Sequence, residues 1–264
     1  MLGLVRLSSS SCWDDPPVLS VILSAYNAES FIENSVTELS SYLDSAELRY
    51  EIIVVNDGST DHTKQRLHSL ISKGLVVCHM PRNQGRGAAI KQGIEVARAK
   101  YIVATDADVP YGPESVLQCY KALHTGAHLV VGDRTLSASS YTEKLTLARR
   151  LLSGIHRLMT RFVLLRSDIR DTQCGLKGFH SSFAKLVPGH CKANRWAFDL
   201  DLIAFALENR VHIDRLPIVL RNNNESTVRV FRDSIDTFLG VCGVVYKRHR
   251  GLYRLVDAER DPHG

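Results

Sequence analysis

The sequence predicts an α/β fold, a mostly parallel β-sheet with helices on both faces. Two observations lead to this prediction. Short apolar segments alternate with segments of helical length through the first half of the chain, as in parallel strands joined by crossover helices. Three of the apolar segments also end in unusual polar residues, and sheets of this kind bind ligands beyond the carboxyl ends of their strands.

The expected strands are short runs rich in Val, Ile and Leu, which suits strands that are buried on both faces. They lie at residues 18–23, 51–55, 75–79, 101–104 and 128–132. The segments between them carry apolar residues at helical spacing or follow a Gly-rich turn. These segments predict helices at residues 30–43, 61–72, 87–99 and 113–124.

The second half is less regular. It begins with a long basic helix (143–165) and a stretch of small and polar residues (171–179). A helix that begins acidic and becomes apolar follows (196–209), and then one or two strands (211–220). The last expected element is an amphipathic helix with a basic end (230–248). We therefore divide the chain into a loose lead-in (1–17), one α/β domain (18–230), and a C-terminal amphipathic helix with a charged tail (231–264).

Composition limits the function. With 264 residues, 44% hydrophobic and 23% charged, the chain is not a disordered, collagen-like or disulfide-scaffold protein. The net charge of +5 fits an anionic ligand or an anionic membrane surface, but it is no signature of nucleic-acid binding. The six cysteines form no CxxC pair, which indicates reduced thiols in a cytosolic compartment.

Membrane contact is expected to be peripheral or through a partner. The apolar stretch at residues 237–246 has about half of the roughly 20 residues that span a bilayer. The apolar start of the chain is interrupted by Gly3 and Arg6, which makes it a poor signal peptide. The basic helix at 143–165 has two interpretations: it lies in a membrane interface at the cytoplasmic face, or it packs on the core with a solvated basic face.

The clearest chemical signal is an acidic pair, Asp106 and Asp108, directly after an apolar strand. Two carboxylates in this position can share a divalent cation with phosphate oxygens, and Mg²⁺ favours such a site. Asp57 follows another strand, where a carboxylate either accepts hydrogen bonds from a nucleobase edge or only shapes the turn. Arg86 lies in a Gly-rich segment that opens a helix, and backbone N–H groups at a helix start attract anions.

These segments resemble family 2 glycosyltransferases with the GT-A fold. The resemblance lies in residues 23–27 (LSAYN), 55–61 (VNDGSTD), 83–87 (NQGRG) and 106–108 (DAD). Two later segments, 171–179 (DTQCGLKGF) and 195–202 (RWAFDLDL), are more specific. They are similar to the polyprenyl-phosphate branch, which includes the dolichyl-phosphate β-glucosyltransferases.

The resemblance implies a role for each matching position. It implies a nucleotide-sugar site formed by Ala25, Tyr26, Asn27, Glu29, Asp57, Arg86, Asp106 and Ala107. It places Mg²⁺ or Mn²⁺ on Asp106 and Asp108, and it matches Asp199 to the catalytic base of related inverting enzymes, with Asp201 as a second carboxylate. The acceptor and the diphosphate would contact Gln173, Arg229 and Arg232.

The implied activity is the metal-dependent, inverting transfer of a hexose, glucose by this resemblance, from a UDP-sugar to a polyprenyl (dolichyl or undecaprenyl) phosphate. Val109 and Pro110 replace the extra amide ligand of some mannosyltransferases, which disfavours GDP-mannose. The alternative is the same donor chemistry on a soluble hydroxyl acceptor, such as a natural product or glycan. A lipid phosphate is already anionic and needs no strong base, whereas a neutral hydroxyl requires Asp199 to act as one.

Two other classes predict different residues. A non-catalytic binding protein would have lost its metal site, yet Asp106 and Asp108 are both present. A nucleotidyltransferase would carry a basic Gly-rich loop after its first strand, where this chain has Ser24-Ala25-Tyr26-Asn27. The sequence does not specify an oligomeric state.

Overall fold

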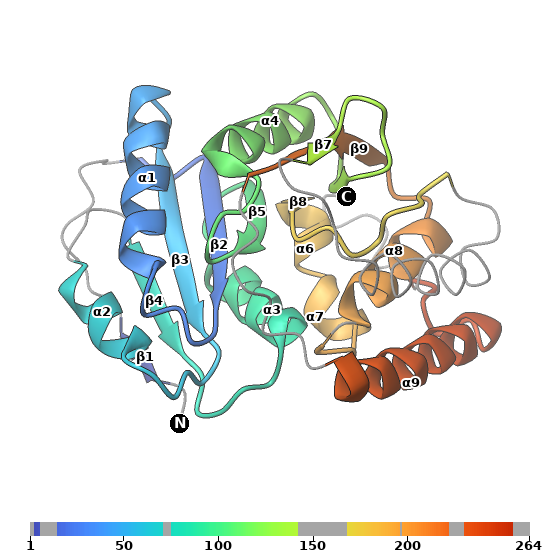
Figure 1. The fold of residues 1–264 in the computed structure, drawn as a ribbon. Coiled ribbons are helices and arrows are strands. Elements are labelled where there is room, and N and C mark those ends of the chain that lie inside the picture. The colour runs from blue at the N-terminus through green and yellow to red at the C-terminus, as the bar shows by residue number, and fades with distance from the viewer. Residues whose placement is uncertain are drawn as a thin grey trace.

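The computed structural model describes residues 3–5, 15–70, 75–141, 168–195, 197–221 and 230–255. An eight-stranded sheet forms its centre, with strand order β1-β4-β3-β2-β5-β8-β6-β9 (Figure 1). The strands are β1 (Gly3–Val5), β2 (Leu19–Ala25), β3 (Tyr50–Asn56), β4 (Leu75–His79), β5 (Tyr101–Asp106), β6 (Leu129–Asp133), β8 (Lys177–His180) and β9 (Ile213–Pro217). A separate parallel pair joins β7 (Ser140–Tyr141) to β10 (Val219–Leu220).

The sheet is mostly parallel, as predicted. Strand β2 pairs in parallel with both β3 and β5, β3 pairs with β4, and β6 pairs with β9. Ser24 at the end of β2 lies opposite Val55 on one side and Asp106 on the other. This register brings the carboxyl ends of β2, β3 and β5 to one edge of the sheet.

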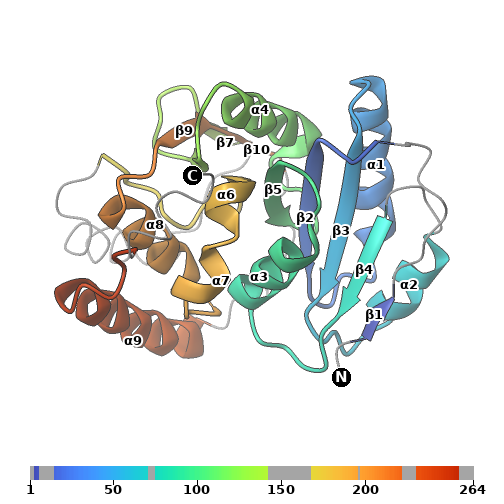
Figure 2. The ribbon, with the colours of Figure 1, turned by 180° about the vertical axis from the view of Figure 1, so that it is seen from behind.

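Helices cover both faces. They are α1 (Ile32–Ser45), α2 (Thr63–Ser69), α3 (Arg86–Val96), α4 (Gly112–His124), α6 (Ser181–Ala184), α7 (Val187–His190), α8 (Phe198–Glu208) and α9 (Val230–His249). Figures 1 and 2 show α1 and α4 on one face and α3 on the other. Alternate residues of β2 divide the core accordingly, because Ile22 packs with α3 and α8 whereas Val21 and Leu23 pack with α1 and α4.

Two elements differ from expectation. Strand β8 runs antiparallel between β5 and β6, within a stretch that the sequence presented as small and polar. Residues 3–5 of the predicted lead-in form the edge strand β1, antiparallel to β4. The expected helix at 143–165 lies outside the described residues.

The C-terminal helix packs against the main body of the fold. Val241, Val244 and Tyr253 belong to the same buried cluster as α3 and α8. Among the described residues, no helix combines the length and the apolar character needed to cross a membrane.

Candidate active site

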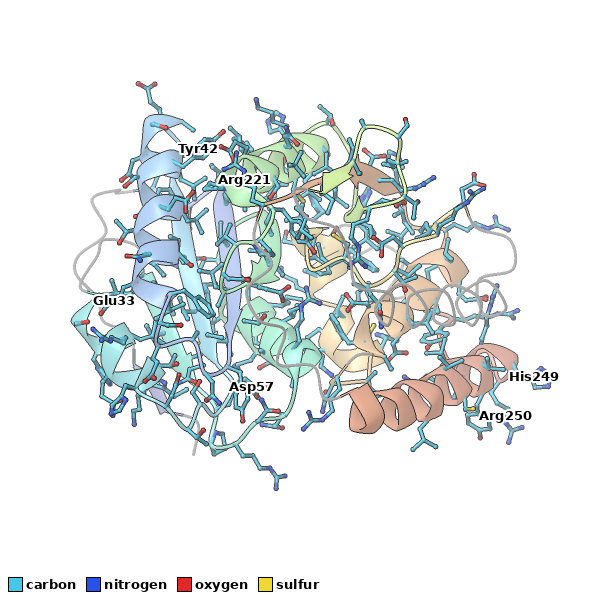
Figure 3. All side chains as sticks on the ribbon, in the orientation of Figure 1. Glu33, Tyr42, Asp57, Arg221, His249 and Arg250 are labelled. Carbon is cyan, nitrogen blue, oxygen red and sulfur yellow. The ribbon has the colours of Figure 1, made fainter. Side chains whose placement is uncertain are left out.

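The segments that follow β2, β3 and β5 are joined by backbone hydrogen bonds. Asp57 N donates to Ala25 O at 2.8 Å, and Ala107 N donates to Ser24 O at 3.2 Å. The predicted residues Ala25, Asp57 and Ala107 therefore lie at one edge of the sheet, as the alternating pattern predicted. Figure 3 shows Asp57 at this edge.

The segment after β2 is fixed to the segment after β3. Asn27, at a φ of +51°, accepts a hydrogen bond from Thr60 N at 2.9 Å. Glu29 Oε2 accepts from His62 N at 2.8 Å, and this hydrogen bond is the main cause of the lowered pKa of Glu29. Asn27 and Glu29 thus shape the loop, while the Tyr26 side chain remains 40% exposed.

Asp57 holds the Gly-rich segment in place. Its two carboxylate oxygens accept hydrogen bonds from Gln84 N and Gly85 N, both at 2.7 Å. Burial raises the pKa of Asp57, and these two hydrogen bonds oppose that rise. The sequence predicted that Asp57 contacts a nucleobase, and in the structure its carboxylate positions the loop that leads to Arg86.

Two glycines bring this loop close to the start of α8. A Cβ atom on Gly85, which has a φ of +101°, would lie 2.7 Å from Asn194 O. A Cβ atom on Gly87 would lie 2.5 Å from the Phe198 side chain. The first turn of α3 therefore packs directly against the segment that carries Asp199.

Arg86 connects the acidic pair to Asp199. Arg86 Nε donates to Asp106 Oδ1 at 2.7 Å, and Nη1 donates to both oxygens of Asp199 at 3.1 Å. Its third nitrogen, Nη2, donates to Gly175 O. One guanidinium thus contacts three other motifs, which lie 20, 89 and 113 residues after Arg86 in the sequence.

Lys177, which was not predicted as a site residue, completes this network. Its side chain is fully buried in β8, with Nζ 3.0 Å from Asp199 Oδ1 and also bonded to Thr172 O and Cys174 O. Burial raises the pKa of Asp199, but the charges of Lys177 and Arg86 bring that pKa below its ordinary value. The available signal was a lysine within a run of small and apolar residues, since a buried lysine needs a charged partner.

The acidic pair fits a divalent cation that is completed by substrate oxygens. Burial, with the nearby charge of Asp106, raises the pKa of Asp108 to about 6. No hydrogen bond or ion pair from another described residue reaches the Asp108 carboxylate, and the described residues contain no cluster of three or more metal-ligating side chains. Two carboxylates, with no third ligand among the residues that the structure describes, match the way Mg²⁺ binds beside substrate phosphates.

Gly175 allows the motif at 171–179 to approach Asp106. A Cβ atom at this position would lie 2.3 Å from Asp106 Oδ2. Gly175 N also donates to the buried Tyr111 hydroxyl at 3.1 Å. The absence of a side chain is therefore a geometric requirement of the site. Gln173, two residues earlier, is half-buried on the same segment.

Asp201 has a different set of partners from Asp199. Its oxygens accept hydrogen bonds from Ala193 N at 2.9 Å and Lys247 Nζ at 3.0 Å, and from the Tyr253 hydroxyl. Residues two apart on a helix point in nearly opposite directions. The structure thus places the predicted second carboxylate in the packing between α8 and the C-terminal segment.

A second buried ion pair fixes the segment after β6. Arg134 Nε lies 2.6 Å from Asp171 Oδ2, and Arg134 Nη2 donates to Asp171 Oδ1 at 2.8 Å. Asp133, fully buried, accepts from Arg215 Nε at 2.8 Å. The pair with Asp171 holds the motif at 171–179 against the segment after β6, and the pair with Arg215 joins β6 to β9. Neither pair was predicted from the sequence.

Two predicted residues cannot be placed at the site. Arg229 lies outside the described residues, and Arg232 lies in α9 at a position whose side chain the structure does not describe.

Known proteins resemble this chain in sequence and in fold. The model of the family "Glycosyl transferase family 2" matches residues 20–185. The chain is 31% identical over 225 residues to dolichyl-phosphate beta-glucosyltransferase of Homo sapiens, covering 79% of this chain and 69% of that protein. It is 26% identical over 263 residues to the Saccharomyces cerevisiae protein of the same name, covering 91% of this chain and 78% of that one.

Solved structures share the fold. Glucosyl-3-phosphoglycerate synthase from Mycobacterium tuberculosis, in complex with Mn²⁺ and UDP-glucose, superposes with a TM-score of 0.63 at 21% identity, covering 86% of this chain and 79% of that one. Staphylococcus aureus TarS 1–349 superposes with a TM-score of 0.61 at 19% identity, covering 92% of this chain and 68% of that one. The fold is thus the GT-A fold that the motifs implied, and the chain belongs to glycosyl transferase family 2.

Proposed function

We propose that this glycosyltransferase moves glucose from UDP-glucose to a polyprenyl phosphate, with inversion at the anomeric carbon and with Mg²⁺ or Mn²⁺ bound. The observation that carries the proposal is the bridge from Asp106 through Arg86 to Asp199. The relatives named as dolichyl-phosphate beta-glucosyltransferases support the acceptor class, and the neighbour solved with Mn²⁺ and UDP-glucose supports the donor.

The donor side is built from the three joined strand ends. Tyr26 offers an exposed aromatic ring, which suits contact with a nucleobase face. Asp57 fixes the backbone of the segment at 84–85 and so sets the position of Arg86. The uridine would lie between these groups, with its diphosphate directed toward Asp106.

Asp106 and Asp108 are the residues that would hold the metal ion. When bound, the ion supplies positive charge to the departing diphosphate. Arg86 orients Asp106 through the hydrogen bond from Nε, and Gly175 leaves room for the other oxygen of that carboxylate. The chain's own contribution is therefore a pre-oriented pair of carboxylates beside a guanidinium.

The state of Asp199 favours an anionic acceptor. Two cations hold the pKa of Asp199 below its ordinary value, and they occupy its oxygens with hydrogen bonds. A carboxylate in this state is a weak base, whereas general-base catalysis is most efficient when the pKa lies near the working pH. A lipid phosphate already carries the charge needed for attack. We therefore assign Asp199 to holding Arg86 and Lys177 in place, and we favour the phosphate acceptor over a hydroxyl.

A matched pair of acceptors tests this assignment. Purified protein with Mg²⁺ or Mn²⁺ is given UDP-glucose, other UDP-sugars or GDP-mannose, together with either a polyprenyl phosphate or the polyprenol of the same chain length. We expect UDP release with UDP-glucose and the phosphate, a β-linked product by NMR, and loss of activity in EDTA. Equal transfer to the polyprenol would contradict the acceptor assignment, and full activity in EDTA would contradict the metal site.

A further inference from the structure

Over residues 239–249, where the structure describes its side chains, helix α9 contacts the rest of the protein through one face. Val241 and Val244 are buried against the core. Lys247 pairs with Asp201 at 3.0 Å, and Arg248 pairs with Glu208 of α8. Two of the basic residues at the end of α9 therefore face inward and are neutralised by carboxylates of α8. These contacts fix the orientation of the helix and so define its opposite face.

Between residues 239 and 246, the outward face of α9 is apolar. Leu239 is 62% exposed, Val245 50% and Tyr246 58%, and the thiol-bearing Cys242 is exposed between them. Positions 239, 242 and 246 are three and four residues apart, so their side chains form one stripe. A helix at a water-covered surface normally carries polar residues on its outer face. The apolar outer face therefore indicates that something other than water covers it.

The charged residues in the last three turns of α9 and just beyond it are all basic, whereas Asp233 and Asp236 lie near the start of the helix. No Asp or Glu occurs between Asp236 and Asp257. His249, Arg250 and Arg254 are exposed at the end of the helix and just beyond it, and the Arg250 guanidinium lies 5.8 Å from the centre of the Tyr246 ring. Figure 3 shows His249 and Arg250 at the outer end of α9, away from the rest of the protein.

We propose that the outward face of α9 docks on an anionic lipid bilayer. An apolar stripe of about two turns with a basic end is the pattern of a helix that lies in the interface plane of a membrane. A second copy of this chain fits less well, because two copies of the same face would bring basic groups against basic groups. Anionic headgroups complement His249, Arg250 and Arg254, and the stripe enters the boundary between headgroups and acyl chains.

The position of α9 gives the docking a functional consequence, which rests on the proposed function. In Figures 1 and 3, α9 lies along the lower edge of the molecule, the edge toward which β2, β3 and β4 run and where Asp57 lies. Docking through α9 would thus turn the candidate active site toward the membrane surface. An acceptor phosphate at the headgroup level could then reach the site while its polyprenyl chain stays in the bilayer.

Vesicle flotation tests the docking without any substrate. The full chain is mixed with vesicles of phosphatidylcholine, with or without about 30% phosphatidylserine, and with no polyprenyl phosphate or nucleotide sugar. We expect flotation with the anionic vesicles that weakens in high salt. Leu239→Asp with Tyr246→Asp should abolish it, and Arg250→Glu should lower the affinity at least about fivefold, since one basic residue contributes roughly that factor at an anionic surface.

Matched changes elsewhere serve as controls. Lys121→Glu alters an exposed charge on α4 and Val219→Asp alters an exposed apolar residue on β10, so both should float like the unchanged protein. Of the five cysteines that the structure describes, only Cys242 is exposed. In a Cys12→Ser background, a polarity-sensitive dye on Cys242 should shift to the blue when anionic vesicles are added.

The outcomes separate docking from catalysis. Absence of flotation, an unshifted dye, or a Leu239→Asp, Tyr246→Asp variant that floats normally would each overturn the docking proposal. So would light scattering that shows an α9-dependent dimer in place of vesicle binding. The Leu239→Asp, Tyr246→Asp variant should transfer glucose to a short, detergent-soluble polyprenyl phosphate as fast as the unchanged protein does. If neither the unchanged protein nor the variant transfers glucose to this acceptor, the result counts against the proposed function and not against the docking.

Discussion

Lys177 and Asp199 form a buried ion pair, with Lys177 Nζ 3.0 Å from Asp199 Oδ1. The lysine comes from an antiparallel strand in the middle of the sheet and the aspartate from the first turn of α8. Because the lysine side chain has no exposure to water, this carboxylate compensates the cost of removing the lysine from water. The pair therefore links the stability of the fold to the geometry around Arg86.

Asp199→Asn should lower the free energy of unfolding by about 3 kcal/mol, because it leaves the buried charge of Lys177 without a carboxylate. Urea denaturation measures the change. A double variant, Lys177→Met with Asp199→Leu, removes both charges and should lose less stability than the single change. The interpretation fails if Asp199→Asn is as stable as the unchanged protein.

Asp108→Asn should stabilise the metal-free protein at pH 7.5 while abolishing transfer. The pKa of Asp108 is about 6 in the folded chain against an ordinary 3.8, so the folded state binds the proton more tightly than the unfolded state. The ionised carboxylate therefore lowers the free energy of unfolding, fully above about pH 6 and progressively less as the pH falls toward 3.8.

Removing the charge should raise the free energy of unfolding by up to about 3 kcal/mol at pH 7.5 and by less than about 1 kcal/mol at pH 4. Urea curves at the two pH values, both in EDTA, measure the difference. A stabilisation of equal size at both pH values would show that its origin is not the titration of Asp108.

Metal affinity should fall as the pH drops through about 6. A proton and a cation compete for the Asp108 carboxylate, so the apparent Kd for Mn²⁺ should rise about tenfold for each pH unit below 6. Calorimetric titration with Mn²⁺ in the presence of UDP measures this dependence. A Kd that stays constant from pH 7 to pH 5 would exclude Asp108 as a ligand.

Gly175→Ala should reduce kcat/KM by about 10- to 100-fold, equivalent to about 1–3 kcal/mol, because the new methyl group displaces Asp106. Gly189→Ala is the matched control, since nothing lies within 4 Å of a Cβ atom at that position. The control should keep full activity. If the Gly175→Ala enzyme is equally active, the position of Asp106 does not limit the reaction.

The first half of the fold was predictable because each of its elements is encoded locally. Strand β4 has the predicted bounds, and the bounds of β2, β3, β5 and β6 differ from the predicted ones by no more than two residues. Periodicity and strand-end polarity are properties of a short window of sequence, and parallel crossover units satisfy them directly. The union of Asp57, Arg86 and Asp106 at one edge follows from the same topology.

The missed features depend on contacts between distant segments. Strand β8 contains a lysine and a glycine in four residues, and it forms because β5 and β6 accept it and Asp199 neutralises Lys177. The resemblance matched Asp199 to the base and Asp201 to a second carboxylate, but the local pattern does not show that Asp201 points away from Arg86. The direction in which each carboxylate points depends on how α8 packs and on Lys247, which binds Asp201 from 46 residues later in the chain.

The place of β8 in the sheet also sets an order of events during synthesis. Strands β5 and β6 are consecutive in the chain but are separated in space by β8, and β6 gains its other neighbour from β9. A nascent chain that has emerged only as far as β7 can assemble the half-sheet from β4 to β5, yet its β5 edge stays open. Ribosome-bound fragments that end near residue 141 should therefore need chaperone protection, and fragments that extend past β9 should not.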